Sequence, residues 1–178
     1  MRRGELLLLV LFFTPCCSSP DLLPDANPPP GIPGLEEMRA EHGTESCRLK
    51  YWEDGDTPVV TCKQASEPQT VRMIGIDTAE SGFDDNSRKR ARKQARLWGM
   101  SYEEVLACGK AATRRVCELC PPDSPVEIVG TELGKYGRRL AYVVCRGINM
   151  NRRLVAEGLA GNYPYPDPAE KPAACPVD

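Results

Sequence analysis

Three short stretches of the sequence carry groups that could perform phosphoryl-transfer chemistry. They cover residues 54–57, 72–80 and 135–142, on segments typical of strands or strand ends. A hard cation prefers oxygen ligands, and an arginine side chain binds phosphate oxygens through two parallel hydrogen bonds. The stretches therefore suit a phosphodiester substrate, and they supply the side chains of Asp56, Asp77, Glu80, Arg72 and Arg138.

The histidine content excludes several other nuclease mechanisms. The sequence has one histidine, His42, which lies in a proline-rich stretch ahead of the three motifs. A Ser-His-Asp triad, a pair of catalytic histidines and a histidine-bound metal each need imidazole groups in the site. Phosphoryl chemistry in this chain must therefore depend on carboxylates, a metal ion and arginines.

Two of the carboxylates are placed so that they could bind one metal ion. Asp56 follows a tight-turn signal, and Asp77 ends a strand-like segment. If both lie at one rim of a barrel, their charges repel each other unless a cation joins them. Calcium is the natural candidate. Residues 54–56 alone would indicate only a hairpin turn, so the metal hypothesis depends on Asp77 and Glu80 downstream.

The elements that must position these groups are predicted from periodicity and turn residues. A long helical stretch runs from 87 to about 116 and is broken near Gly99. Strands are expected at residues 47–52, 58–62, 70–76, 126–129 and 140–145. Five strands with inserted helices are typical of an α+β fold built on a five-stranded OB-fold Greek-key barrel of the kind that often binds oligonucleotides. Such a fold does not define a function by itself.

A further helix is predicted after the last strand. Apolar residues at positions 150, 154 and 155 recur at helical spacing. Either Asn149 or Asn151 suits the N-cap of this helix, and Gly158 suits its end.

The charge is divided unevenly along the 178 residues. Segment 46–165 holds 19 Lys and Arg against 15 Asp and Glu, a net charge of +4, whereas the flanks hold 4 against 10, a net charge of −6. Much of the basic excess lies in residues 87–96. Such a run attracts polyanions and predicts binding that weakens steeply with salt. A solvated helix face is the alternative interpretation of this run.

In their order and spacing, the three motifs resemble those of the staphylococcal nuclease (thermonuclease) family over roughly residues 47–165. The resemblance implies that Asp56, Asp77 and the backbone carbonyl of Thr78 bind calcium. It also implies that Glu80 positions or deprotonates the attacking water. Ala79 stands where the family usually has proline, which predicts a looser loop around Glu80.

The resemblance assigns the remaining site residues to the substrate. Arg72 and Arg138 would stabilise the charge that builds up on the phosphoryl group, although Arg72 alone could equally be a surface ion pair. Lys135 and Tyr136 would hold the terminal phosphate and stack near a base, with packing on the barrel as the alternative for Tyr136. Arg139 is expected to be solvated.

These roles imply an exported, calcium-dependent endonuclease of the thermonuclease type. It would hydrolyse single- and double-stranded DNA and RNA with little sequence selectivity, cleaving on the 5'-oxygen side to leave 3'-phosphate ends. Two other functions are open: a non-catalytic OB-fold module that binds nucleic acid, and a disulfide-stapled interaction module at a surface. No obligate protein partner is predicted.

The flanking segments indicate export. Residues 1–19 read as a signal peptide and 20–45 as a proline-rich flexible tether, with the nuclease-like domain at 46–165 and a flexible tail at 166–178. The protein is expected to be secreted or periplasmic. A lipid anchor on Cys16 or Cys17, immediately after the apolar run, is the alternative and would be the chain's one link to a membrane.

Cysteine usage agrees with export. Seven cysteines follow the signal region, and Cys47 and Cys62 lie nearly equidistant from the turn at 54–57, so they could form a disulfide across a hairpin. Residues 117–120 have a CxxC spacing, but no second CxxC or histidine pair accompanies it, which disfavours zinc. Further disulfides are expected to Cys108, Cys145 and Cys175, with their connectivity open.

Overall fold

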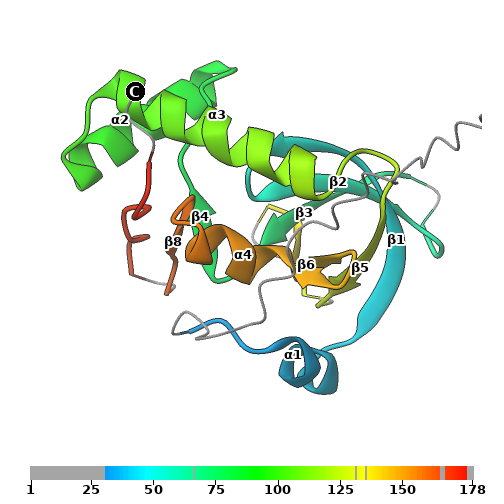
Figure 1. Ribbon diagram of the computed structural model, residues 1–178. Helices are drawn as coiled ribbons and strands as arrows, with labels where there is room; N and C mark the ends of the chain where they lie inside the picture. Colours follow the sequence, from blue (N-terminus) through cyan, green and yellow to red (C-terminus); the bar gives the residue numbers. More distant parts are fainter. Residues whose placement is uncertain (1–30, 66, 131, 135, 165–166, 176–178) are drawn as a thin grey trace, which may run out of the picture.

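The computed structural model describes residues 31–65, 67–130, 132–134, 136–164 and 167–175. Five strands form a closed barrel: β1 (Thr44–Asp54), β2 (Thr57–Cys62), β3 (Gln69–Met73), β5 (Pro125–Val129) and β6 (Arg139–Cys145). Their order is β3-β2-β1-β5-β6, and a parallel pairing of β3 with β6 closes the ring (Figure 1). The predicted five-stranded OB-type barrel is confirmed. A two-residue strand, β7 (Ile148–Asn149), extends the sheet beside β6.

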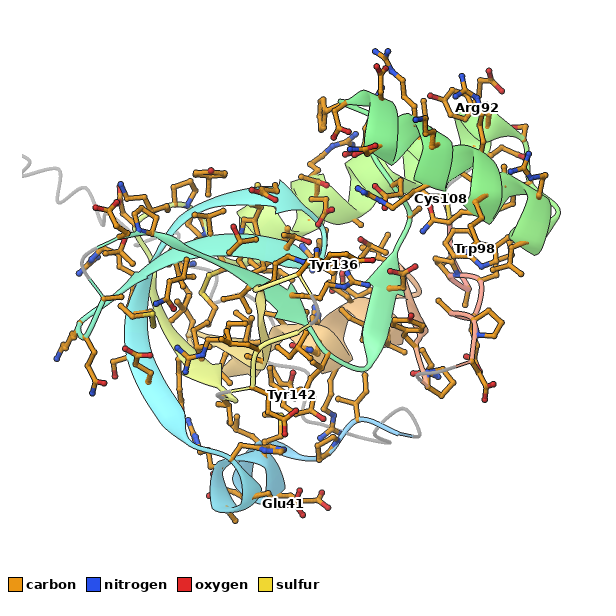
Figure 2. The ribbon with its side chains drawn as sticks, turned by 180° about the vertical axis from the view of Figure 1, so that it is seen from behind. Glu41, Arg92, Trp98, Cys108, Tyr136 and Tyr142 are labelled. Carbon is orange, nitrogen blue, oxygen red and sulfur yellow. A yellow bond between two sulfur atoms is a disulfide. The ribbon has the colours of Figure 1, made fainter. Side chains whose placement is uncertain are left out.

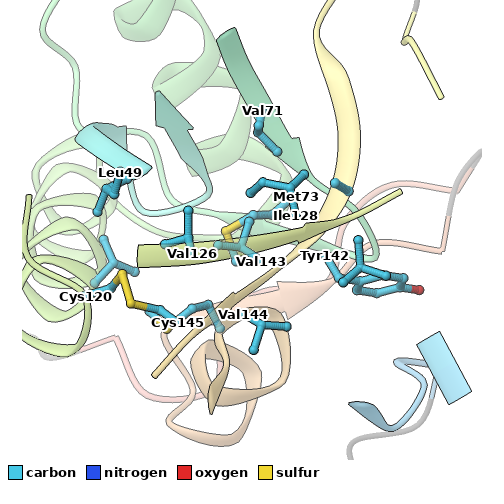
Figure 3. Packing of buried hydrophobic residues seen from close by; sticks show 14 of the residues in the cluster. Leu49, Val71, Met73, Cys120, Val126, Ile128, Tyr142, Val143, Val144 and Cys145 are labelled. Carbon is cyan, nitrogen blue, oxygen red and sulfur yellow. A yellow bond between two sulfur atoms is a disulfide. The ribbon is translucent and has the colours of Figure 1, made fainter. Parts of the chain in front are cut away.

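The barrel is filled by β-branched and other apolar side chains from all five strands. Leu49, Val60, Val71, Ile128 and Val143 have no exposed surface, and Figure 3 shows several of them converging inside the barrel. Strand residues alternate between the two faces of a sheet, so each strand contributes every second side chain to this interior. The result is a rigid support whose rim carries the charged motifs.

One predicted strand is two strands in the structure. The segment expected to run from 70 to 76 breaks after Met73, and Gly75 adopts a φ of +74°, a conformation that glycine reaches without strain. The chain then continues as β4 (Ile76–Thr78), which leaves the barrel and pairs with β8 (Ala160–Asn162). The prediction missed this turn because apolar residues continue through it. The turn redirects the chain immediately before Asp77.

Two helices follow β4 and are separated where the sequence predicted. Helix α2 (Asp85–Trp98) ends at Gly99, which has the left-handed conformation of a helix C-cap, and α3 (Tyr102–Leu119) begins after the N-cap Ser101. The Asp84 side chain caps α2 by accepting the backbone N–H groups of residues 86 and 87. In Figure 1 the two helices lie together on one side of the barrel.

The helix predicted after the barrel is α4 (Met150–Ala156), and its N-cap is Asn149, whose side chain accepts the backbone N–H of Arg152. Asn151 has a different task. It is fully buried, its Oδ1 accepts the Val143 N–H at 3.0 Å, and its Nδ2 donates to the Ile74 carbonyl at 2.8 Å. Asn151 therefore ties α4 to a barrel strand and to the turn that precedes β4.

Removing the Asn151 amide should destabilise the fold. The substitution Asn151→Leu leaves a buried donor and a buried acceptor without partners, and each such group costs about 1–3 kcal/mol. We expect the free energy of unfolding, measured by urea denaturation, to fall by about 2–4 kcal/mol. The control Asn86→Leu changes an exposed side chain on α2 and should cost less than about 0.5 kcal/mol. Equal effects of the two substitutions would contradict this account.

The segments predicted as flexible are partly folded. Helix α1 (Leu35–Glu41) lies within the predicted tether 20–45, and β1 also begins inside it. Met38 of α1 is fully buried, which supplies the apolar contact that a proline-rich composition did not suggest. At the other end, Glu170 donates its N–H to the Asn162 carbonyl at 2.8 Å, so part of the predicted tail packs beside β8. The signal-peptide prediction lies outside the described residues.

Within the described residues, three disulfides link parts of the domain. The predicted Cys47–Cys62 bond joins β1 to β2, where the two residues are paired in register. The connectivity left open by the sequence is Cys108–Cys175 and Cys120–Cys145, and the latter bond is visible beside the barrel core in Figure 3. Because Cys120 is oxidised, the CxxC pair is not a zinc site.

In the described part of the chain, no helix is both long and apolar enough to cross a membrane.

Candidate functional site

An open pocket of about 490 Å³ lies at the rim of the barrel. It is formed by the β1–β2 turn, β3, β4 with the loop that follows it, α2 and the segment before β6. Its lining residues are Asp54, Asp56, Thr57, Arg72, Asp77, Thr78, Glu80, Asn86, Arg90, Tyr136 and Arg138. Apart from Lys135, which lies outside the described residues, every candidate site residue of the sequence analysis contributes to this one pocket.

The floor of the pocket is an ionic cluster around Arg72. Its guanidinium group forms ion pairs with the carboxylates of both Asp56 and Asp77. Asp56 is 2% exposed and is held from a second side, because its Oδ2 accepts the Thr78 backbone N–H at 2.7 Å and the Thr78 hydroxyl at 3.0 Å. The turn after β3 brings these groups together, since it places β4 alongside the β1–β2 turn.

The buried carboxylates respond differently to their surroundings. Burial raises the pKa of Asp77 to about 6, and Arg72 offsets only part of this effect. Burial and the charge of Asp56 raise the pKa of Asp54 to about 7. Burial also acts on Asp56, but the Arg72 guanidinium and the hydrogen bonds from Thr78 hold its pKa below the ordinary value. One arginine thus lies among three buried carboxylates, and its positive charge keeps the pKa of only one of them, Asp56, below the ordinary value.

The donors around this cluster fit a calcium ion. Asp56, Asp77 and the Thr78 carbonyl offer oxygen atoms only, which is the ligand type that calcium prefers. Burial raises the pKa values of Asp54 and Asp77, and a cation bound beside them would favour their charged forms. Asp54 was not singled out from the sequence as a site residue. The sequence signal that could have identified Asp54 is its position in the same turn motif as Asp56.

Glu80 lies at the edge of the pocket and is oriented by a residue that the sequence analysis did not single out. Its carboxylate accepts a two-pronged contact from Arg90 on α2, one prong being the Nη2–Oε2 hydrogen bond of 3.0 Å. The Glu80 side chain is 14% exposed and that of Arg90 is 55% exposed. The sequence placed Arg90 in a basic run but gave no signal that distinguished it from its neighbours, because the pairing depends on how α2 docks.

Arg138 and Tyr136, from the segment before β6, form another part of the pocket wall. The Arg138 side chain is half-buried, and no described residue forms a hydrogen bond or ion pair with it. Tyr136 is 78% exposed, and Figure 2 shows it at the barrel rim. Both residues, together with Arg72, also line a second hollow of about 670 Å³, whose other lining residues are Met73, Ile74, Gly75, Leu133, Gly134, Leu140 and Tyr163.

Arg139 differs from the expectation that it is solvated. It is 9% exposed, its Nη1 contacts Glu45 Oε2 at 2.5 Å, and its Nε donates to the Gly130 carbonyl at 2.8 Å. Arg139 is the first residue of β6 and does not line the pocket, whereas Arg138 precedes the strand and lines it. Arg139 is therefore a structural residue.

The outer side of α2 is strongly basic. Its exposed cationic side chains are those of Arg88, Lys89, Arg92, Lys93 and Arg96, whereas Arg90, also exposed, contacts Glu80 in the pocket. Figure 2 shows Arg92 on the outside of this helix and Trp98 on the side nearer the C-terminal segment. Because Asn86 and Arg90 of the same helix line the pocket, the basic surface continues directly from the carboxylate cluster.

The chain is similar in sequence to known proteins. A family model described as staphylococcal nuclease homologue matches residues 70–175. An uncharacterized protein from Bacillus anthracis is 33% identical over 127 residues, which cover 71% of this chain and 48% of that protein. The chain thus spans about half the length of this relative.

Proposed function

Because the chain belongs to the family of staphylococcal nuclease homologues, we propose that it is a calcium-dependent endonuclease that hydrolyses phosphodiester bonds of DNA and RNA. The observation that carries the proposal is the single pocket that unites Asp56, Arg72, Asp77, Glu80 and Arg138. These groups are the ones that metal-assisted attack of water on a phosphodiester requires.

Each residue of the pocket has a separate task in this proposal. Asp56, Asp77 and the Thr78 carbonyl would hold calcium, which supplies positive charge beside the phosphoryl oxygens when it is bound. Glu80 orients the attacking water and accepts its proton. Arg138, together with Arg72, forms hydrogen bonds with the non-bridging oxygens as negative charge accumulates on them.

The bonds that change follow from in-line attack. The water oxygen bonds to phosphorus as the bond from phosphorus to the 5'-oxygen breaks, and the leaving oxygen takes a proton from solvent. The phosphate therefore remains on the 3' side. The charged groups of the pocket suit phosphate contacts, which carry no sequence information, so selectivity among sequences and between DNA and RNA is expected to be low.

A cleavage assay with defined ends tests the function. The purified protein is incubated with single-stranded DNA, double-stranded DNA and RNA, each with calcium or with an excess of a calcium chelator. We expect calcium-dependent cleavage within the strand that leaves 3'-phosphate ends. Cleavage that persists in the chelator would refute the metal role. Salt-sensitive binding without cleavage would instead support the non-catalytic nucleic-acid-binding module.

The basic outer side of α2 should extend the contact with nucleic acid. For duplex DNA, log K falls linearly with log salt concentration. Changing Arg88, Lys89, Arg92 and Lys93 to glutamine should make this slope less negative, by about 0.9 for each phosphate contact that is lost. Binding is measured between low and physiological salt. The control changes Lys110 and Arg114, which are exposed on α3 and do not line the pocket, to glutamine, and the two variants are compared per charge removed. A slope that changes equally in both variants would show that α2 is only a solvated helix.

Export is also part of the proposal, and the three disulfides support it because such bonds persist in oxidising compartments. We propose removal of the signal peptide at residues 1–19, with a lipid anchor on Cys16 or Cys17 as the alternative. Mass measurement of the mature N-terminus distinguishes the two: an unmodified N-terminus beyond Cys17 rules out the anchor.

A further inference from the structure

The loop that carries Glu80 is enclosed by the two helices that follow it. Ala79 is 1% exposed and packs with Ala91 and Ala95 of α2 and with Val105 of α3. On the α3 side, a Cβ added to Gly109 would lie 2.5 Å from the Glu80 carbonyl carbon and oxygen, so the helix backbone directly abuts the loop. The loop is therefore tightly packed, although it has alanine where a proline would have restricted it.

One buried side chain of α2 forms hydrogen bonds with three residues at the end of β4 and in this loop, which are Asp77, Thr78 and Glu80. The Gln94 Oε1 accepts the Glu80 backbone N–H at 2.9 Å. The Nε2 group donates to the Thr78 carbonyl at 3.0 Å and to Asp77 Oδ2 at 3.2 Å. Gln94 is 8% exposed, and an amide has both the acceptor and the two donors that this arrangement needs.

The partners of Gln94 are the groups on which the proposed reaction depends. Two are proposed calcium ligands, and the third is the backbone of the residue proposed to activate water. Arg90, which contacts the Glu80 carboxylate, precedes Gln94 by four residues and so lies on the same face of α2. One face of α2 thus holds both the backbone and the side chain of Glu80.

We propose that Gln94 is a positioning residue of the nuclease site, which holds the ligand oxygens of Asp77 and Thr78 and the backbone of Glu80 in one fixed arrangement. The inference rests on the proposed function and deepens it. Groups that orient metal ligands from behind commonly change metal affinity or activity by about 10–100-fold when they are removed. Gln94 is not among the described residues that line the pocket, whereas Arg138 and Tyr136 are, so binding of nucleic acid should depend on Gln94 little.

The test is the substitution Gln94→Met, which keeps the length of the side chain and removes all three hydrogen bonds. We expect the calcium Kd, measured by calorimetry without substrate, to rise about 10-fold or more, and kcat at saturating calcium to fall about 10–100-fold. KM for nucleic acid should stay within about two-fold of the unaltered value if Arg138 and the basic side of α2 dominate binding. Gln64→Met, at an exposed turn after β2, is the matched control and should change none of these quantities.

A second readout does not depend on activity. In the calcium-free protein, loss of the Gln94 acceptor should speed hydrogen exchange of the Glu80 amide by about 10-fold or more, because local opening no longer breaks that bond. A folded Gln94→Met protein with unchanged calcium Kd, kcat and Glu80 exchange would overturn the inference. If this variant does not fold, Gln94→Glu retains the acceptor and removes both donors, and a kcat equal to that of the unaltered protein would then overturn it.

The same measurements separate this inference from the proposed function. An unaltered protein that cleaves nothing would refute the nuclease, whereas the exchange rate of the Glu80 amide would still show whether Gln94 holds the loop. An active protein that is indifferent to both substitutions at position 94 would refute the positioning role alone.

Discussion

Replacing Arg138 by alanine is expected to lower kcat by about 10³-fold while the protein stays folded. The reason lies in the contrast with Arg72, which is already paired with Asp56 and Asp77. Among the described residues, Arg138 has no such partner, although it is half-buried in the same pocket. Its guanidinium group is thus available to phosphoryl oxygens, and its loss leaves no buried charge unpaired.

The Arg138 prediction is checked by steady-state kinetics together with thermal unfolding. Arg138→Lys should restore only part of the activity, because an ammonium group keeps the charge but cannot form the two-pronged contact. Arg114→Ala removes an exposed arginine of α3 outside the pocket and should leave kcat unchanged. Full activity of Arg138→Ala would show that this arginine has no role in the transition state. A large loss of stability would show a structural role instead.

The sequence predicted the barrel and most of the pocket because the relevant signals are local. Strand alternation, the turn before Asp56, the helix break at Gly99 and an asparagine cap at position 149 or 151 each depend on a few neighbouring residues. The charged motifs were predictable in the same way, because each occupies a single strand end. Their convergence required the barrel to close, which the OB-fold assignment supplied.

What the sequence did not predict depends on contacts between distant segments. The pairing of Arg90 with Glu80 and the hydrogen bonds of Gln94 arise from the docking of α2, which leaves no periodic signal. Helix α1 was missed because its anchor is one buried methionine in an otherwise polar and proline-rich stretch. Arg138 and Arg139 are adjacent and alike, and only the folded structure shows that Arg139 is the buried one, through its contacts with Glu45 and Gly130.

The packing of Ala79 removes the reason to expect a loose loop around Glu80. A proline at position 79 would restrict the loop through its own backbone, so alanine at this position predicted a looser loop. In the structure, the restriction comes instead from α2 and α3, which bury Ala79 and bring Gly109 against the Glu80 backbone. The rigidity of the loop is therefore coupled to the two helices and to the Cys108–Cys175 bond that joins α3 to the C-terminal segment.

The substitution Glu80→Gln should lower kcat by about 10²–10³-fold, with KM for nucleic acid changed little. Glutamine has nearly the same shape as glutamate but cannot accept the proton of the attacking water. The contact with Arg90 provides a second explanation, because a neutral amide would hold this arginine less firmly. The measurement must therefore separate loss of the proton acceptor from loss of the ion pair.

A double-mutant cycle with Arg90→Ala makes this separation. If Glu80 accepts the proton, Glu80→Gln should cost far more than Arg90→Ala, for which we expect about a 10-fold loss from poorer orientation of the carboxylate. The double variant should then be no more active than Glu80→Gln alone, because orientation no longer matters once the acceptor is gone. If Glu80 serves only to hold Arg90, the two single variants and the double variant should lose the same amount. Equal losses of kcat in the two single variants and the double variant would thus contradict the role of Glu80 as the base. They would indicate that the Glu80–Arg90 ion pair is itself needed for activity.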